Sequence, residues 1–309
     1  MGTPQFAAYQ LNYLLENNIN VAAVITMPDK PMGRGMKLGQ SAVKQVAEEK
    51  GLPVLQPEKL RDENFLEQLA NYRADVFVVV AFRMLPKAVW SMPPMGTLNL
   101  HASLLPKYRG AAPINWAIIN GENETGVTTF FIQEEIDTGD ILLTEKESIA
   151  PNDNAGSLHD KLMVLGAKVI LKTLKALEQG TIIGVPQRQL KPEDHLLAPK
   201  IYKEDCKINW GNDRNQIINH IRGMSPYPTA FTNLQTSDGK IIGLKIFEAR
   251  PSERILEPGK MWTDGKTEWS IGTKNGSIEL QDVQLEGKKR MDIRSFLMGF
   301  HPETVVEII

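Results

Sequence analysis

The first two-thirds of the chain alternate between strand-like and helix-like segments, and this alternation restricts the possible folds more than any other feature. Residues 20–26 and 76–81 are strand-like and apolar enough to be buried, whereas residues 41–51 and 61–72 have the apolar periodicity of helices. Buried strands that are separated by helices form parallel sheets covered by those helices. The sequence therefore predicts an α/β domain with a doubly wound, mostly parallel, Rossmann-like sheet.

The same alternation continues beyond residue 90. Strands are predicted at residues 97–101 and 127–132, with a helix at 113–120 between them. A long helix follows, in which apolar residues recur at spacings of three and four, and Gly180 can end it. We therefore predict that the first domain covers residues 1–184.

The pattern changes after residue 184. Residues 185–204 contain three prolines, several charges and no sustained periodicity, which indicates a linker. Residues 205–309 begin with one helix, at 213–224, and continue as short strand candidates that turn pairs such as Asn275-Gly276 separate. The strand candidates are residues 229–234, 241–248, 261–263, 268–272 and 277–283. This spacing predicts a small antiparallel β-barrel, similar to an OB fold, over residues 205–309.

Charge and cysteine content exclude several classes of protein. The 35 Lys and Arg against 37 Asp and Glu give a net charge of −2, so a nucleic-acid partner needs a local basic patch. The single cysteine, Cys206, cannot form an internal disulfide, and the histidines lack the spacing of metal ligands, so we expect no metal. The longest apolar run, residues 76–82, is far shorter than the roughly 20 residues that span a bilayer. We expect a cytoplasmic protein that does not associate with membranes.

Two polar side chains share one face of the strand predicted at residues 97–101. Because successive side chains of a strand alternate between its faces, Asn99 and His101 point the same way. Open α/β sheets bind their ligands at the carboxyl ends of the strands, so this pair is a candidate catalytic site. Asn-x-His alone is equally compatible with a solvated edge strand. The long connection at residues 103–113, however, is suited to line a substrate site.

The segment Ile136-Asp137-Thr138-Gly139-Asp140 is the second candidate. Its residue types let a loop turn back with a carboxylate at its tip, although an ordinary Asx turn has the same composition. Adjacent parallel strands of the predicted sheet would bring Asp137 beside Asn99 and His101. We therefore expect these three residues to form one catalytic group.

Two basic clusters are suited to phosphate contacts, with solvated surface charge as the alternative in both cases. The clusters are Lys30, Arg34, Lys37 and Lys44 in a glycine-containing loop, and Lys288, Lys289 and Arg290 near the C-terminus. Either cluster would supply the local basic patch that a nucleic-acid partner requires.

These motifs resemble the folate-dependent formyltransferases, in the branch that acts on charged tRNA, and the similarity covers nearly the whole chain. The motifs of the catalytic core are residues 99–106 (NLHASLLP), 109–113 (RGAAP) and 136–140 (IDTGD). Residues 1–7 resemble the first strand-to-helix turn of the family, and residues 28–35 its tRNA-contacting loop. Further similarities to the C-terminal domain of the family lie at Ile221-Arg222, Pro226, Pro228 and Gly287-Lys288-Lys289.

The resemblance implies transfer of a formyl group from 10-formyltetrahydrofolate to the amino group of methionine on initiator tRNA, for translation initiation. Asn99, His101 and Asp137 would be catalytic, and both basic clusters would bind the tRNA. The folate contacts would be Arg83, Met84, Ser103, Leu104, Leu105, Pro106 and Asp140. The chain departs from the family at residues 81–83, where Ala-Phe-Arg replaces the usual Ala-aromatic-Gly. We expect the enzyme to be a monomer.

Two other functions remain open on the sequence. A formyltransferase acting on an amino sugar nucleotide would share the three catalytic residues, although the basic loop around Arg34 argues against it. A catalytically silent RNA-binding protein would have no reason to bring Asn99, His101 and Asp137 into one pocket. A formylation assay with charged tRNA distinguishes the tRNA enzyme from the sugar-nucleotide enzyme. Calorimetry with folate distinguishes a formyltransferase from the silent RNA-binding protein.

The first turn lacks the strand that normally precedes it. In a doubly wound domain the ligand-carrying turn follows the first strand, and only Met1 stands before Gly2. We therefore expect the natural product to begin about half a dozen apolar-rich residues upstream, which is one strand length.

Overall fold

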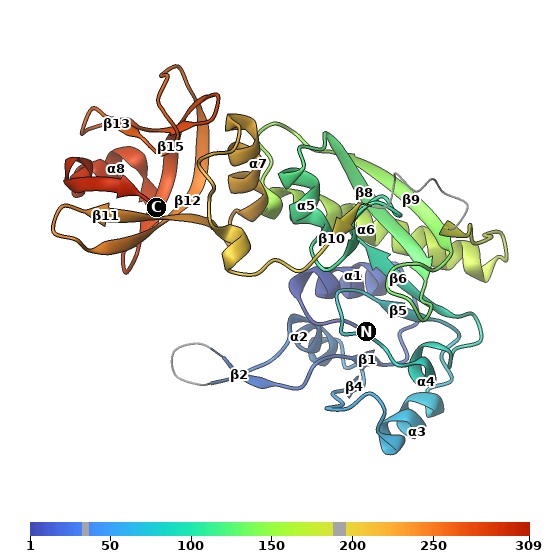
Figure 1. Ribbon diagram of the computed structural model, residues 1–309. Helices are drawn as coiled ribbons and strands as arrows, with labels where there is room; N and C mark the ends of the chain where they lie inside the picture. The colour runs from blue at the N-terminus through green and yellow to red at the C-terminus, as the bar shows by residue number, and fades with distance from the viewer. Residues whose placement is uncertain (33–36, 188–195) are drawn as a thin grey trace. The chain divides into compact units, whose positions relative to one another are not determined.

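The computed structural model describes residues 1–32, 37–187 and 196–309 (Figure 1). Its contacts divide the chain into two compact units that interleave along the sequence. The first unit consists of residues 1–110, 125–147 and 160–197, and the second of residues 111–124, 148–159 and 198–309. Among the described residues, no helix has both the length and the apolar character that crossing a membrane requires.

The first unit contains the expected parallel strand pairs. β1 (Val24–Ile25) pairs in parallel with β4 (Val54–Leu55), and β5 (Phe77–Val79) pairs in parallel with β6 (Thr97–His101). β8 (Glu124–Phe131) is antiparallel to β6, and β9 (Ile141–Ser148) follows it at the edge. The prediction of a doubly wound, mostly parallel domain is confirmed, with an antiparallel strand added beyond β6.

Helices of the first unit begin where the sequence supplies capping residues. The Ser41 hydroxyl accepts the N–H of Lys44 at the start of α2 (Ala42–Glu49), and the Asp62 carboxylate accepts the N–H of Phe65 at the start of α3 (Glu63–Asn71). The other helices are α1 (Gln5–Glu16), α4 (Lys87–Trp90) and α6 (Ala155–Glu178). Gly180, at φ 63°, follows the end of α6 in the left-handed conformation that glycine adopts readily.

Two strands are shorter than the sequence predicts. The apolar stretch at residues 20–26 pairs as a strand only over β1, and the stretch at 76–81 only over β5 with one further bridge at Val80. A strand needs a hydrogen-bonded neighbour on at least one side, and β1 and β5 have almost none on the sides that face each other. Among the described residues, Met1 and Gly2 alone provide backbone partners there.

The second unit is built on a seven-stranded antiparallel sheet that curls (Figure 1). Its main path runs β13-β14-β15-β12-β11-β17, with β16 paired to β15. The strands are β11 (Ala230–Thr236), β12 (Ile241–Ser252), β13 (Met261–Thr263), β14 (Trp269–Thr273), β15 (Gly276–Leu285), β16 (Met291–Asp292) and β17 (Val305–Ile308). The antiparallel barrel-like class is confirmed, although β16 and β17 were not among the predicted strands.

Helices and a buried core complete this unit. α5 (Pro113–Ile119) contacts α7 (Arg214–Met224), where a Cβ on Gly223 would lie 3.0 Å from the backbone oxygen of Asn115. Arg222 of α7 donates to the carbonyls of Ala150 and Asp153, each within 2.9 Å. The short helix α8 (Ile293–Leu297) belongs to the apolar core around Trp269, which is fully buried.

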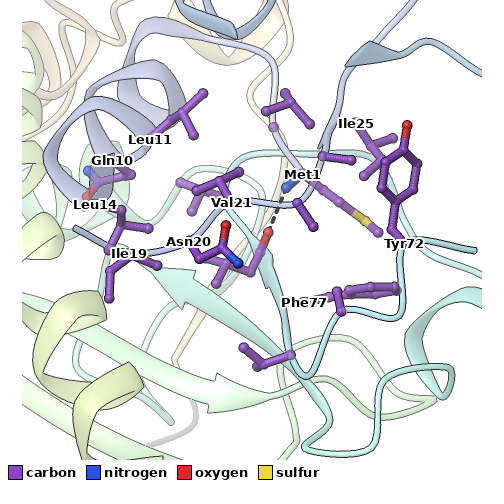
Figure 2. A pocket seen from close by; sticks show the side chains of 18 of the residues that line it. Met1, Gln10, Leu11, Leu14, Ile19, Asn20, Val21, Ile25, Tyr72 and Phe77 are labelled. Carbon is purple, nitrogen blue, oxygen red and sulfur yellow. Dashed lines mark hydrogen bonds between the residues drawn. The ribbon is translucent and has the colours of Figure 1, made fainter. Parts of the chain in front are cut away.

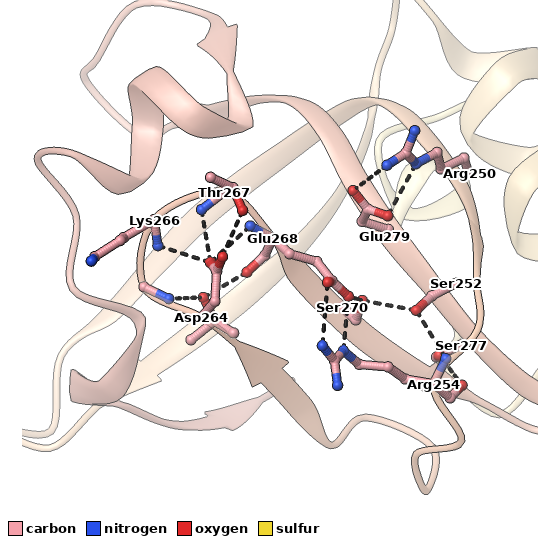
Figure 3. A network of polar contacts seen from close by, with 12 residues as sticks. Arg250, Ser252, Arg254, Asp264, Lys266, Thr267, Glu268, Ser270, Ser277 and Glu279 are labelled. Carbon is pink, nitrogen blue, oxygen red and sulfur yellow. Dashed lines mark hydrogen bonds and ion pairs between the residues drawn. The ribbon is translucent and has the colours of Figure 1, made fainter.

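Polar contacts tie the turns of this sheet together (Figure 3). The Asp264 carboxylate accepts hydrogen bonds from the backbone of residues 266–268 and from the Thr267 hydroxyl, and these bonds lower its pKa below its ordinary value. Nearby, Arg254 forms an ion pair with Glu268 at 2.8 Å, which lowers the pKa of that carboxyl. These contacts explain why short, turn-rich strands form an ordered sheet.

Candidate active site

β6 presents Asn99 and His101 on one face, as the alternation of the strand requires. Asn99 lies between Val79 of β5 and Phe130 of β8, and His101 lies opposite Thr128. Both residues are near the carboxyl end of β6, where the parallel pair β5–β6 ends. The predicted strand Thr97–His101 is confirmed to the residue.

The His101 ring is held by one nitrogen and faces a carboxylate with the other. Its Nε2 lies 2.8 Å from the carbonyl oxygen of Tyr108, and because a carbonyl only accepts, Nε2 carries the proton of this bond. Its Nδ1 lies 3.8 Å from Oδ2 of Asp137, which is ion-pair range but longer than a direct hydrogen bond. The side chains are only 8% and 11% exposed. The predicted meeting of His101 and Asp137 is therefore present, but the predicted reason for it is wrong. β8 is antiparallel to β6, so its carboxyl end lies beside Leu98, and Asp137 comes near His101 because the loop after β8 turns back.

The Asp137 loop has a backbone that few residues can adopt. Asp137 has φ 55°, in the left-handed region that Asp tolerates better than most residues. Its Oδ2 accepts the N–H of Gly110 at 2.9 Å. At Gly139 a Cβ would lie 1.6 Å from the carbonyl oxygen of Phe131, so any side chain there would push the loop away from β8. The loop is thus built to hold one carboxylate in place.

A buried glutamine that sequence alone assigns to the linker holds this loop. Gln187 is 1% exposed, and its Nε2 donates to the carbonyls of Asp137 at 3.0 Å and Gly139 at 2.7 Å. Its Oε1 accepts from Nε of Arg109 at 3.0 Å. Burial lowers the pKa of Arg109, while Asp137 and Glu135 act in the opposite direction. Gln187 therefore supports the Asp137 loop, and no local sequence pattern indicated this.

Asn99 contains an unused polar atom. It is half-buried, and its Oδ1 is buried with no hydrogen-bond partner among the described residues. Buried polar atoms usually have partners, so an orphaned one beside His101 fits a site that takes a polar ligand. A half-turn of the side-chain amide exchanges its oxygen and its NH₂ group, so either group can face that ligand.

Residues 103–106 form a tightly held loop after β6. Ser103 is fully buried, and its hydroxyl donates to the carbonyl of Lys107 at 2.6 Å. The Thr128 hydroxyl donates to the Ser103 carbonyl at 2.7 Å and accepts the N–H of Leu105 at 3.2 Å. Leu105 and Pro106 are also buried, whereas Leu104 is partly exposed. The Ser103 side chain thus supports the loop rather than facing a ligand.

The remaining predicted folate contacts lie after β5 and β8. Arg83 donates to the carbonyls of Pro57 and Glu58, the latter at 2.8 Å, so its guanidinium ties two loops together. Met84 is 72% exposed, and Asp140 is half-buried. The family departure at Arg83 therefore has a structural role within the chain itself.

The first basic cluster is only partly available for phosphates. Lys30 is exposed, in β2 (Lys30–Met32), which pairs with β3 (Lys37–Gly39). Lys44 forms an ion pair with Asp29 at 2.5 Å, a contact that raises its pKa. Arg34 lies outside the described residues.

The second basic cluster divides in the same way. Lys288 and Lys289 are exposed, whereas Arg290 forms an ion pair with Asp282 at 2.7 Å and lies 4.1 Å from the ring centre of Phe247. The sequence grouped these three residues together, but the structure separates the paired arginine from the two lysines.

Comparison with known families agrees with this geometry. A model described as "Formyl transferase" matches residues 1–174, and one described as "Formyl transferase, C-terminal domain" matches residues 200–301. The chain therefore belongs to the formyl transferase family.

Relatives narrow the group further. A protein named methionyl-tRNA formyltransferase from Parabacteroides distasonis is 52% identical over 305 residues, which cover 97% of this chain and 94% of that protein. One of the same name from Flavobacterium johnsoniae is 50% identical over 301 residues, with the same coverage. A solved N-formyltransferase from Helicobacter canadensis, in complex with folinic acid and dTDP-3-aminofucose, has a TM-score of 0.65 at 21% identity, covering 91% of this chain and 97% of that one. The similarity to this solved structure shows that the two proteins share a fold.

Proposed function

We propose that this chain transfers a formyl group from 10-formyltetrahydrofolate to the free amino group of methionyl-initiator tRNA, which yields N-formylmethionyl-tRNA for translation initiation. The relatives that share about half of its residues over nearly its full length support this choice of substrate. The observation that carries the chemistry is the 3.8 Å approach of His101 to Asp137, beside the amide oxygen of Asn99 that has no partner among the described residues.

The reaction needs a neutral amine and a place for its proton. An α-amino group has a pKa of about 8, so much of it is protonated at neutral pH. The bond between the formyl carbon and N10 of the folate breaks, and a bond from that carbon to the amine nitrogen forms. Asp137 receives the proton that leaves the amine, directly or through water, and N10 ends with one proton.

The other two residues stabilise charge and deliver the second proton. Attack on the formyl carbon places negative charge on its oxygen, and the Asn99 NH₂ group donates to that oxygen as a fixed dipole. Because Nε2 of His101 is held by Tyr108, Nδ1 is the nitrogen that acts on the substrate. The Asp137 carboxylate stabilises the imidazolium while Nδ1–H donates to the oxyanion, and this proton then passes to N10. The proton that Asp137 takes from the amine moves on to Nδ1, so both residues end the cycle as they began it.

Folate binding is proposed for the loops around this group. The loop of Ser103, Leu104, Leu105 and Pro106 follows β6 directly, and Thr128 holds its backbone. Leu104 is its partly exposed apolar side chain. Arg83, Met84 and Asp140 follow neighbouring strands, and Met84 offers the most exposed apolar surface of the three. The orphaned Oδ1 of Asn99 is the atom that best fits a polar group of this ligand.

Phosphate contacts with tRNA are proposed for Lys30, Arg34, Lys37, Lys288 and Lys289. Lys44 and Arg290 leave this set, because Asp29 and Asp282 already neutralise their charges. Lys30, Lys288 and Lys289 are exposed, whereas Lys44 and Arg290 would first have to break their ion pairs. We further propose that the enzyme acts as a monomer in the cytoplasm.

The experiment that tests the substrate is a formylation assay with two acceptors. The purified chain is supplied with 10-formyltetrahydrofolate and either methionyl-tRNA or an amino sugar nucleotide, because a structural neighbour was solved with dTDP-3-aminofucose. We expect product only on the charged tRNA. Formylation of the sugar nucleotide alone would assign the chain to the second class.

A further inference from the structure

The two short strands β2 and β3 lie between β1 and α2 in the sequence and form a hairpin. They pair antiparallel, and Lys30 lies opposite Gly39 in the pair farthest from the tip. Among the described residues these strands pair only with each other. An isolated two-stranded hairpin is marginally stable in water, so its direction depends on what holds its two ends. We call the segments on either side of it, residues 26–29 and 41–44, the hairpin base.

Two side-chain contacts close the hairpin base. The hydroxyl oxygens of Thr26 and Ser41 lie 2.7 Å apart, so one donates a hydrogen bond to the other. Nζ of Lys44 lies 2.5 Å from Oδ2 of Asp29. In both contacts one residue precedes the hairpin and the other follows it. The chain that enters the hairpin is therefore joined twice to the chain that leaves it.

Gln56 supports the hairpin base from outside. This residue directly follows β4, and its Nε2 donates to Oδ1 of Asp29 and to the carbonyl of Met27, both at 2.8 Å. The Asp29 carboxylate thus accepts from Lys44 through one oxygen and from Gln56 through the other. The hydrogen bond with Lys44 is the main reason that the pKa of Asp29 is lowered. Three separate segments of the chain meet at this carboxylate.

The elements that carry the hairpin base are packed into the first unit. α2 contacts α1, β1 and β4. Ile25 of β1 and Val43 of α2 are both buried, and both line a cavity of about 260 Å³ that opens beside Met1 (Figure 2). Because neighbouring residues of a helix point in directions about 100° apart, Val43 faces the interior while Lys44 reaches Asp29. The contacts of Asp29 therefore join the hairpin to a well-packed part of the unit.

The ion pair between Asp29 and Lys44 is more enclosed than an ordinary surface pair. The side chain of Lys44 is 13% exposed and that of Asp29 is 24% exposed. Exposed ion pairs contribute little to stability, whereas a partly buried pair is screened less by water and salt. An unpaired carboxylate at this place would also repel a phosphate that approached the exposed Lys30. Lys44 therefore both fixes and neutralises Asp29.

We propose that Asp29 and Lys44 are positioning residues for the charged tRNA, and that their ion pair sets the direction in which the β2–β3 hairpin presents its lysines to the phosphates. This inference rests on the proposed function. A hairpin that is already oriented loses less conformational freedom when the tRNA binds, so preorganisation raises affinity without a new contact. The pair then contributes to tRNA binding although neither residue touches the tRNA.

Three variants and one control test this proposal. Asp29→Asn removes the charge but keeps an oxygen for Gln56, and Lys44→Met removes the ammonium but keeps most of the side-chain length. The third variant combines both changes. Asp238→Asn is the matched control, because Asp238 forms an ion pair of the same 2.5 Å length with Lys240 in the second unit. Lys44→Gln takes the place of Lys44→Met if that variant does not fold.

Steady-state formyl transfer is the first readout. We expect each single variant to raise the KM for methionyl-tRNA by about tenfold, within the range for one coupled contact. The kcat and the KM for 10-formyltetrahydrofolate should stay within about twofold of wild type, because a lost binding contact weakens the bound substrate and the transition state equally. The double variant should raise the KM for tRNA no further than a single one, since both changes break the same contact.

Hydrogen exchange of the β2 and β3 amides is the second readout, and it needs no substrate. We expect faster exchange in the three variants than in Asp238→Asn. A wild-type KM for tRNA in both single variants of an active enzyme would overturn the inference, and so would a KM for folate that rises equally or additive effects in the double variant. A wild-type chain that does not formylate methionyl-tRNA would instead refute the proposed function. Unchanged exchange in β2 and β3 would overturn the inference in either case.

Discussion

Nδ1 of His101 lies 3.8 Å from Oδ2 of Asp137, while the carbonyl of Tyr108 holds the other ring nitrogen. The ring therefore has one nitrogen for its support and one for chemistry, and the second faces a carboxylate. The same carboxylate accepts the N–H of Gly110, so it is restrained as well. For this reason the proposed mechanism uses Nδ1, and not Nε2, to deliver a proton to the substrate.

Removal of the imidazole is expected to slow the reaction without unfolding the protein. His101→Ala should lower kcat by about 10² to 10⁴, the range of general acid–base groups. His301→Ala is the control, because that histidine is exposed in the second unit. The measurement is steady-state formyl transfer to methionyl-tRNA, together with an unfolding curve for each variant. A kcat for His101→Ala equal to that of the control would show that the imidazole takes no part in the reaction.

Gln187 is expected to act as a positioning residue. Gln187→Leu removes its hydrogen bonds to the carbonyls of Asp137 and Gly139 and to Arg109 while nearly keeping the side-chain volume. A displaced Asp137 should lower kcat by up to about 10²-fold. Gln179→Leu, at an exposed position after α6, is the matched control. If both variants keep wild-type kcat, the loop does not depend on Gln187.

The strand and loop that carry the proposed catalytic residues could be predicted because their signals are local. Alternation identifies β6, and the composition Asp-Thr-Gly identifies the turn at Asp137. Gln187 could not be found this way, because its partners Asp137 and Gly139 are some 50 positions away in the sequence and its own segment has no periodicity.

The basic clusters show a second limit on what the sequence can predict. Sequence gives the positions of Lys44 and Arg290 but not their ion pairs with Asp29 and Asp282, which depend on how separate elements pack. The lengths of β1 and β5 show a third limit, since pairing depends on neighbours that local propensity does not describe.

The buried Met1 amine predicts a pH-dependent stability for the 309-residue chain. Its pKa falls from 8.0 to about 5 on folding, so between these values the unfolded chain binds more protons and stability rises with pH. The stability present above pH 8 is lost as the pH falls toward 5, by up to about 4 kcal/mol, since one pKa unit corresponds to about 1.4 kcal/mol.

The test is urea unfolding at several pH values between 5 and 8. The same chain with an acetylated N-terminus is the control, because it has no amine to titrate. The other titratable side chains at the cavity, Tyr72, Arg73 and Asp75, are present in both chains. The slope of stability against pH should be smaller in the acetylated chain, and identical slopes would contradict the assignment.

The exposed lysines are expected to set the salt dependence of tRNA binding. Lys288→Ala with Lys289→Ala should lower the slope of log affinity against log salt concentration by about 0.7 to 0.9 for each lost phosphate contact. Arg290→Ala should change it much less, because Asp282 already pairs with that charge. Binding of methionyl-tRNA at a series of salt concentrations measures both slopes. Equal reductions of this slope in the two variants would show that Arg290 also contacts the phosphates of the tRNA.

The role of Asp137 is tested most directly by Asp137→Asn. The amide keeps an oxygen that can accept the N–H of Gly110, so the loop is preserved while the base and its charge are lost. The measurement is single-turnover formyl transfer from 10-formyltetrahydrofolate to methionyl-tRNA, with folate binding measured separately by calorimetry. We predict a rate lower by about 10² to 10⁴ with folate affinity retained. A rate within about threefold of the wild-type value, in a variant that still binds folate, would contradict the account.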